Sequence, residues 1–137
     1  MEINAVIEKI EVESKAKAKA DPVFYATMKV GDYHRQGDVY IMRIDKPNET
    51  TIKAMKIRAQ IAPGTTQGSR HCISGATLKH IRMYEKNIST ALDGPVLECF
   101  KQTEITHPEH GHVGLPAGWY AITFQRQLAD ELRRVAD

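Results

Sequence analysis

The regular spacing of turn residues constrains the fold of this chain more than any other feature of its sequence. From Pro22 onward, clusters of Gly, Pro, Asn and Asp recur every ten to fifteen residues, and the runs between them are rich in β-branched and aromatic residues. Short strands separated by such turns are typical of all-β sandwiches and barrels. The sequence therefore predicts a mainly β fold over residues 1–137, a single small sandwich or barrel of about eight strands.

Three segments have the residue pattern of strands. Apolar and polar residues alternate from Met55 to Ile61, which predicts a strand with one buried face. Val39–Ile44 is apolar at both parities apart from Arg43, which predicts a strand covered on both faces. Residues 120–124 alternate as well and predict a further strand that begins after Trp119.

The two ends of the chain differ from this pattern. Residues 14–22 lack large apolar side chains and end at Pro22, so they are predicted to form an exposed connector. Leu128, Leu132 and Val135 recur with helical spacing, which predicts a short C-terminal helix over 127–137. Such a helix could pack on the domain or join two copies into a homo-oligomer.

Composition limits the class of protein and its partners. The 137 residues are 42% hydrophobic and 26% charged, as in a soluble globular domain, and no segment predicts a membrane span. The 19 Lys and Arg against 17 Asp and Glu give a net charge of +2, so charge does not indicate a nucleic-acid partner. The N-terminal segment has no apolar run of a secretory signal, and Cys72 and Cys99 lack metal or redox spacing, so we expect a cytoplasmic protein.

The densest group of chemically active side chains lies between Thr106 and His112. It contains three imidazoles and one carboxylate within six positions. A divalent metal such as zinc takes imidazole nitrogen, so His107, His110 and the more distant His71 are candidate metal ligands, with Glu109 as a candidate catalytic general base. The same imidazoles could instead line a polar pocket that hydrogen-bonds a ligand near neutral pH.

Candidate binding residues lie in three other segments. Arg35, Gln36 and Asp38 precede a predicted strand, and the Arg35 guanidinium could bind phosphate or carboxylate, or could pair with Asp38 or Asp32. Arg70 ends a loop that is rich in Gly and hydroxyl residues but lacks the lysine of a P-loop. Arg126 lies between two glutamines after the last predicted strand and would be a binding residue if it lay beside Arg35.

Several short motifs together carry a resemblance to a family. RQGDV, a Gly- and His-containing loop, HPEH, LPAGWY and QRQ occur in this order between Arg35 and Gln127. The order resembles a family of small uncharacterised bacterial and phage proteins with RQGDV, GHxH, HxEH, LPxGxY and QR motifs. The resemblance implies a site made of matched residues, namely Arg35, Gln36, Asp38, His71, His107, Glu109, His110 and Arg126.

This chain departs from the pattern of that family at one position. Ser69 stands where the GHxH motif has its first histidine, which weakens any site that needs four imidazoles. A weaker likeness to cupins rests on the Pro116-Ala117-Gly118 turn, but the cupin order of His-x-His and a downstream Glu is missing.

These observations predict a ligand-binding or interaction module. Its polar pocket of His and Arg residues would hold an anionic small molecule, a nucleotide or a partner peptide. One alternative is a metal-dependent enzyme, cupin-like or hydrolytic, that uses the histidines as ligands. Another is a structural subunit of a larger assembly.

Overall fold

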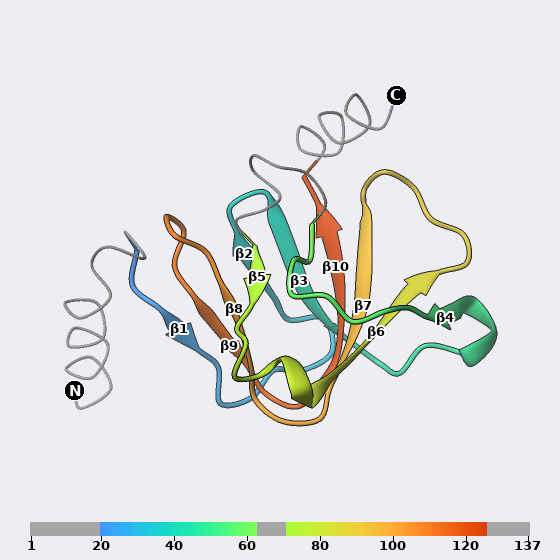
Figure 1. Cartoon of the computed structure of the whole chain (residues 1–137), viewed down its shortest axis with the longest axis horizontal. Coiled ribbons are helices and arrows are strands. Elements are labelled where there is room, and N and C mark those ends of the chain that lie inside the picture. Colours follow the sequence, from blue (N-terminus) through green and yellow to red (C-terminus); the bar gives the residue numbers. More distant parts are fainter. Residues whose placement is uncertain (1–19, 63–70, 126–137) are drawn as a thin grey trace.

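The computed structural model describes residues 20–62 and 71–125, which form two β-sheets that face each other (Figure 1). The strands of the smaller sheet are, in spatial order, β1 (Val23–Phe24), β9 (Val113–Leu115), β8 (Thr103–Thr106) and β5 (Cys72–Ile73). The strands of the larger sheet are β2 (Tyr33–Gln36), β3 (Val39–Ile44), β10 (Gly118–Phe124), β7 (Asp93–Cys99), β6 (Ile81–Lys86) and β4 (Ile52–Ala54). Two single-turn 3-10 helices, η1 (Glu49–Thr51) and η3 (Leu78–His80), connect strands.

The architecture confirms a mainly β fold with two layers. Each sheet has two free edges in its strand order, so the described part of the chain is a sandwich and not a closed barrel. It has ten strands where about eight were predicted. The helix predicted over 127–137 lies outside the described residues. Of the predicted connector 14–22, only residues 20–22 are described, and Pro22 is buried instead of exposed.

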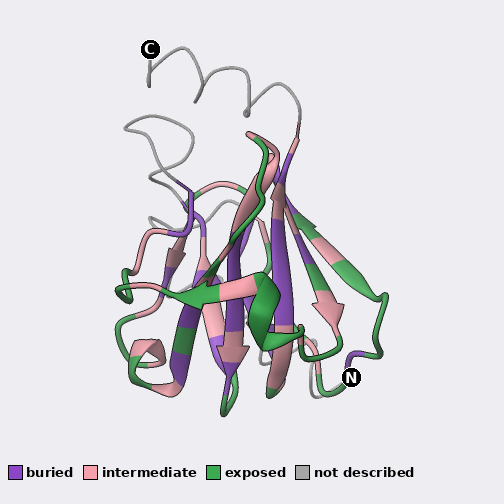
Figure 2. Ribbon diagram, turned by 90° about the vertical axis from the view of Figure 1, so that its right-hand side faces the viewer, coloured by how far each residue is buried: buried purple, intermediate pink, exposed green. Residues whose placement is uncertain are grey.

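One hydrophobic core fills the space between the sheets. The larger sheet contributes the buried faces of β3 and β10, including Ile41 and Ile122, and the smaller sheet contributes Ile105, Val113 and Leu115. The buried residues line the inner strand faces, whereas exposed residues dominate the connections (Figure 2). Fully burying one such aliphatic side chain contributes about 1.5–3 kcal/mol.

The strand predicted over Val39–Ile44 is confirmed, but it is covered on one face only. Val39 and Ile41 point into the core and are completely buried, whereas Met42, the residue after Ile41, is 39% exposed. Successive side chains of a strand point to opposite faces. The apolar residues of the second parity therefore line the outer face of the larger sheet.

The strand predicted over Met55–Ile61 is wrong. Met55 N donates to Met83 O of the larger sheet, while Ile61 N donates to His71 O beside the smaller sheet. The segment thus passes from one sheet to the other, and only Gln60 forms a β-bridge, with Cys72. The apolar residues at its two ends, Met55 and Ile61, pack on the core, whereas Ile57 in the middle is 42% exposed, so the alternation of the sequence does not mark one buried strand face.

The connection between β3 and β4, residues 45–51, crosses the outer face of the larger sheet and contains η1 (Figure 2). We call this segment the strap. Asn48 caps η1 by accepting a hydrogen bond from Thr50 N at 2.9 Å, and Asn87 Nδ2 donates to Thr50 O at 2.7 Å. The bond from Asn87 ties the strap to the end of β6, and cavities lie on both sides of the strap.

Candidate functional site

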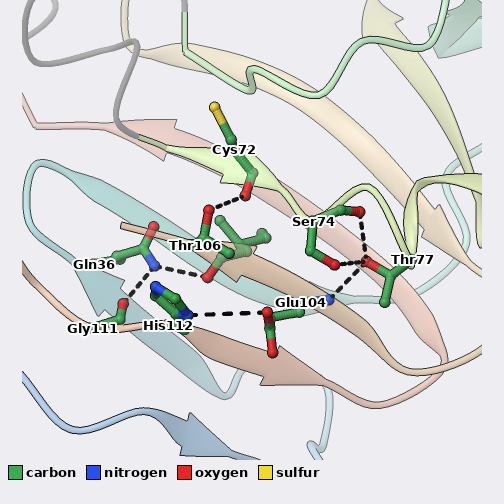
Figure 3. A network of polar contacts seen from close by, with 9 residues as sticks. Gln36, Cys72, Ser74, Thr77, Glu104, Thr106, Gly111 and His112 are labelled. Carbon is green, nitrogen blue, oxygen red and sulfur yellow. Dashed lines mark hydrogen bonds and ion pairs between the residues drawn. The ribbon is translucent and has the colours of Figure 1, made fainter. Parts of the chain in front are cut away.

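A buried polar network joins the two sheets at the end of the sandwich where β2 turns into β3. Gln36 Nε2 on β2 donates to Ile105 O on β8 at 3.0 Å and to Gly111 O at 2.8 Å (Figure 3). Gln36 Oε1 lies 2.8 Å from His71 Nδ1. Because an amide oxygen only accepts, the proton of His71 is on Nδ1, and its Nε2 presents a lone pair.

The hydrogen bonds of His107 fix its tautomer in the opposite sense. Its Nδ1 accepts from the backbone N–H groups of Glu109 and His110, each at 3.0 Å. This nitrogen therefore carries no proton, and the neutral ring holds its proton on Nε2. The turn after β8 thus closes on the side chain of its own first histidine.

The three histidines predicted from distant segments lie together. The ring centroids of His71 and His107 are 4.5 Å apart, and those of His107 and His110 are also 4.5 Å apart. His71 and His107 are each 1% exposed, whereas His110 is exposed. Burial, with the neighbouring His107 and His110, lowers the pKa of His71 to about 3, so its ring is neutral at pH 7.

This arrangement does not favour a divalent-metal site, which was one of the two alternatives for these histidines. Within residues 20–62 and 71–125, no group of three or more His, Cys, Asp or Glu side chains is placed to hold a metal ion. A metal ligand needs a free nitrogen lone pair, but His107 Nδ1 is occupied by two amides and its Nε2 carries the proton. The rings of His71 and His107 are tilted against each other by 53°, and those of His107 and His110 by 44°. Glu109 is half-buried in the same turn, and its role as a general base stays a prediction.

Two exposed groups contact the tight turn at Gly37. Arg35 Nε donates to Gly37 O at 2.9 Å, and Arg35 Nη2 donates to Gln125 Oε1 at 3.3 Å. The His110 ring lies against Gly37 so closely that a Cβ there would be 2.5 Å from His110 Cδ2. Gly37 also has a φ of +58°, which a residue without a side chain adopts most easily. The turn thus brings a guanidinium and an imidazole to one backbone position.

The predicted binding residues of β2 point to opposite faces of the larger sheet. Arg35 and Gln36 are neighbours on β2, so Gln36 points between the sheets while Arg35 lies on the outer face, 5.7 Å above the Tyr40 ring. Asp38 is half-buried, and its carbonyl accepts from Gln125 N at 2.8 Å. Arg35 bonds to Gly37 and Gln125 rather than to the carboxylates predicted as its alternative partners.

Arg70 and Arg126 lie outside the described residues, so their predicted roles stay predictions. Their described neighbours in sequence, His71 and Gln125, contact Gln36 and Asp38 respectively. Two residues near the site were not among the predicted ones: Gly111, whose carbonyl accepts from Gln36, and His112, whose Nδ1 lies 4.0 Å from a Glu104 carboxylate oxygen (Figure 3). The signal for both was their place in the same histidine-rich segment.

A comparison with protein families gives one match. The profile of a domain of unknown function, DUF8820, matches residues 35–125, which is more than half of the chain. The chain belongs to this family. The DUF8820 region begins at Arg35 and ends at Gln125, the two residues whose side chains meet beside Gly37.

The DUF8820 match supports the predicted relation to an uncharacterised family, while the individual motifs and a bacterial or phage origin stay predictions. Searches of curated proteins and of solved structures gave no match. Among the described residues, no helix is long and apolar enough to cross a membrane.

Proposed function

We propose that this DUF8820 domain is a binding module for a small anionic ligand, held at the Gly37 turn by Arg35 and His110. The observation that carries the proposal is that both exposed side chains contact the same glycine. A guanidinium has five N–H donors and keeps its charge at any physiological pH. Two donors are used by Gly37 O and Gln125, so the others can bind phosphate or carboxylate.

The buried network supports this site by holding the turn in place. Gln36 fixes the strand before Gly37 to the opposite sheet, and the His107 turn positions His110. Side chains that are locked by such contacts lose little freedom when a ligand binds. Asp38 adds one carboxylate to the same turn, so we expect a ligand with a single anionic group rather than a polyanion.

The proposal is tested by calorimetric titration of the full chain with inorganic phosphate, with AMP and with acetate. We expect one of the three to bind, and Arg35→Gln to weaken its affinity about tenfold or more, as for a lost charged hydrogen bond. Higher salt should also weaken binding because both partners are exposed to solvent. Preference for AMP or acetate would separate a nucleotide from a carboxylate ligand.

Arg58→Gln is the matched control. Arg58 is exposed, and its Nε donates to the carbonyl of Gln60 at 2.9 Å, the same local geometry as Arg35 and Gly37. Equal losses in both variants, or no binding of any probe, would contradict the proposal. Stoichiometric zinc that is lost in His71→Ala would instead favour the metal-dependent enzyme.

A further inference from the structure

The second feature with the chemistry of a binding site lies on the outer face of the larger sheet, beside the strap. A cavity of about 310 Å³ is lined there by Trp119, Tyr84, Glu98 and Arg82 from the sheet and by Lys46 and Glu49 from the strap. Its volume is at the lower end of the range of small-molecule sites. The Gly37 turn contributes none of these residues, so this cavity is separate from the proposed anion site.

Two aromatic rings form the floor of this cavity. Trp119 on β10 lies opposite Glu98 on β7, and its ring centroid is 5.3 Å from that of Tyr84 on β6. The hydroxyl of Tyr84 donates to Glu98 Oε1 at 2.9 Å. All three residues are only half-buried although they lie in the middle of the sheet. Aromatic rings in such a position offer an apolar face surrounded by polar groups.

The charged groups around the floor balance. Glu98 and Glu49 carry two negative charges, and Arg82 and Lys46 carry two positive ones. Lys46 and Glu49 are 3.6 Å apart, and the Arg82 guanidinium lies over the Phe100 ring at 5.2 Å. Lys46 is already paired with Glu49, and Glu98 adds a second carboxylate, so a phosphate would be repelled here, while a quaternary ammonium would be repelled by Arg82 and Lys46. The cavity therefore suits a neutral ligand with many hydrogen-bonding groups.

We propose that this cavity binds a saccharide ring. A sugar has an apolar C–H face that can stack on the Trp119 and Tyr84 rings. Its hydroxyls can donate to the carboxylates of Glu98 and Glu49 and accept from Arg82 and Lys46. The volume accommodates a mono- or disaccharide unit. This inference goes beyond the proposed anion binding and does not depend on it.

The first experiment applies the full chain to an array of immobilised neutral hexose, pentose and N-acetylhexosamine glycans. The best-retained glycan is then titrated in solution while tryptophan fluorescence is followed. Trp119 is the only tryptophan in the sequence, so all tryptophan emission comes from the floor of this cavity. We expect saturable binding with a dissociation constant of about 1 mM or below and a clear change in Trp119 emission.

Substitutions then locate the site. We expect Glu98→Gln to weaken binding of the glycan about tenfold or more, because it removes a charged acceptor without changing the size of the side chain. Glu85→Gln is the matched control, since Glu85 is on the same strand as Tyr84, is exposed and pairs with Lys53 at 3.2 Å outside the cavity. Arg35→Gln should leave glycan binding unchanged, which separates this proposal from the anion site.

Three results would overturn the inference. The first is the absence of any glycan retained by the array. The second is binding that leaves Trp119 fluorescence unchanged, which would place the glycan elsewhere. The third is an equal loss of affinity in Glu98→Gln and Glu85→Gln.

Discussion

Gly37 is the residue on which the proposed anion site depends most directly. We predict that Gly37→Ala lowers the free energy of unfolding by about 2 kcal/mol or more, because φ is +58° and the new Cβ would meet the His110 ring at 2.5 Å. The displaced ring should also change the NMR signals of His110. Urea denaturation measures the change in unfolding free energy, and the NMR shifts of the His110 imidazole report the displacement of its ring.

Two comparisons separate the clash from the backbone strain at Gly37. Gly31 also has a positive φ, +96°, but nothing lies within 4 Å of a Cβ there, so Gly31→Ala reports strain alone. In a double-mutant cycle, His110→Ala should recover part of the cost of Gly37→Ala. A cost that is the same with and without the His110 ring would show that the ring does not pack on the glycine.

The residues of the site were only partly predictable from the sequence. The gathering of His107 and His110 follows from their short spacing, and their contact with His71 required a fold that brings β5 next to β8. Arg35 and Gln36 were both predicted as binding residues, and their side chains lie on opposite faces of β2, as the alternation along a strand implies. The tautomer of His107 depends on the shape of its turn, which no residue pattern specifies.

Gln36 ties strand β2 to the opposite sheet by two buried hydrogen bonds, and His34 adds a contact to the Tyr25 hydroxyl beside β1. We predict that Gln36→Leu lowers the free energy of unfolding by about 3 kcal/mol or more, since it leaves two buried carbonyls and the His71 Nδ1–H without their partner. Urea denaturation measures the loss. Gln125→Leu is the control, because that half-buried amide only accepts from the exposed Arg35, and it should cost about 1 kcal/mol or less. Similar costs would mean that the link between the sheets contributes little.

Elements were predictable where one face of a strand meets the core. The alternation after Trp119 gave β10 because this strand lies inside the larger sheet with partners on both sides. The same pattern misled at Met55–Ile61, which bonds to one sheet at each end and in the middle reaches Met83 Sδ through Arg58 N instead of pairing as a strand. In Val39–Ile44, the apolar residues that point away from the core lie on the outer face of the larger sheet, beneath the strap. Met42 is one of them, and it lines a cavity there of about 560 Å³.

In the described part of the molecule one core joins both sheets, so we expect this part to unfold cooperatively, and the buried His71 should make its stability depend on pH. Its pKa is about 3 in the fold and near 6.5 in an unfolded chain. The unfolded state therefore binds more protons below pH 6.5. The stabilisation from the neutral ring is complete above that pH and is lost as the pH falls towards 3.

We therefore predict that acid sensitivity decreases in His71→Gln. Between pH 6 and 4, the slope of unfolding free energy against pH should fall by up to about 1.4 kcal/mol per pH unit, the value for one proton. Part of the slope should remain, because burial also lowers the pKa of His34. Urea denaturation at a series of pH values measures it, with the half-exposed His80→Gln as control. If His71→Gln kept the slope of the unmodified chain, the ring would not be held neutral between the sheets, and the network that supports the Gly37 turn would need another explanation.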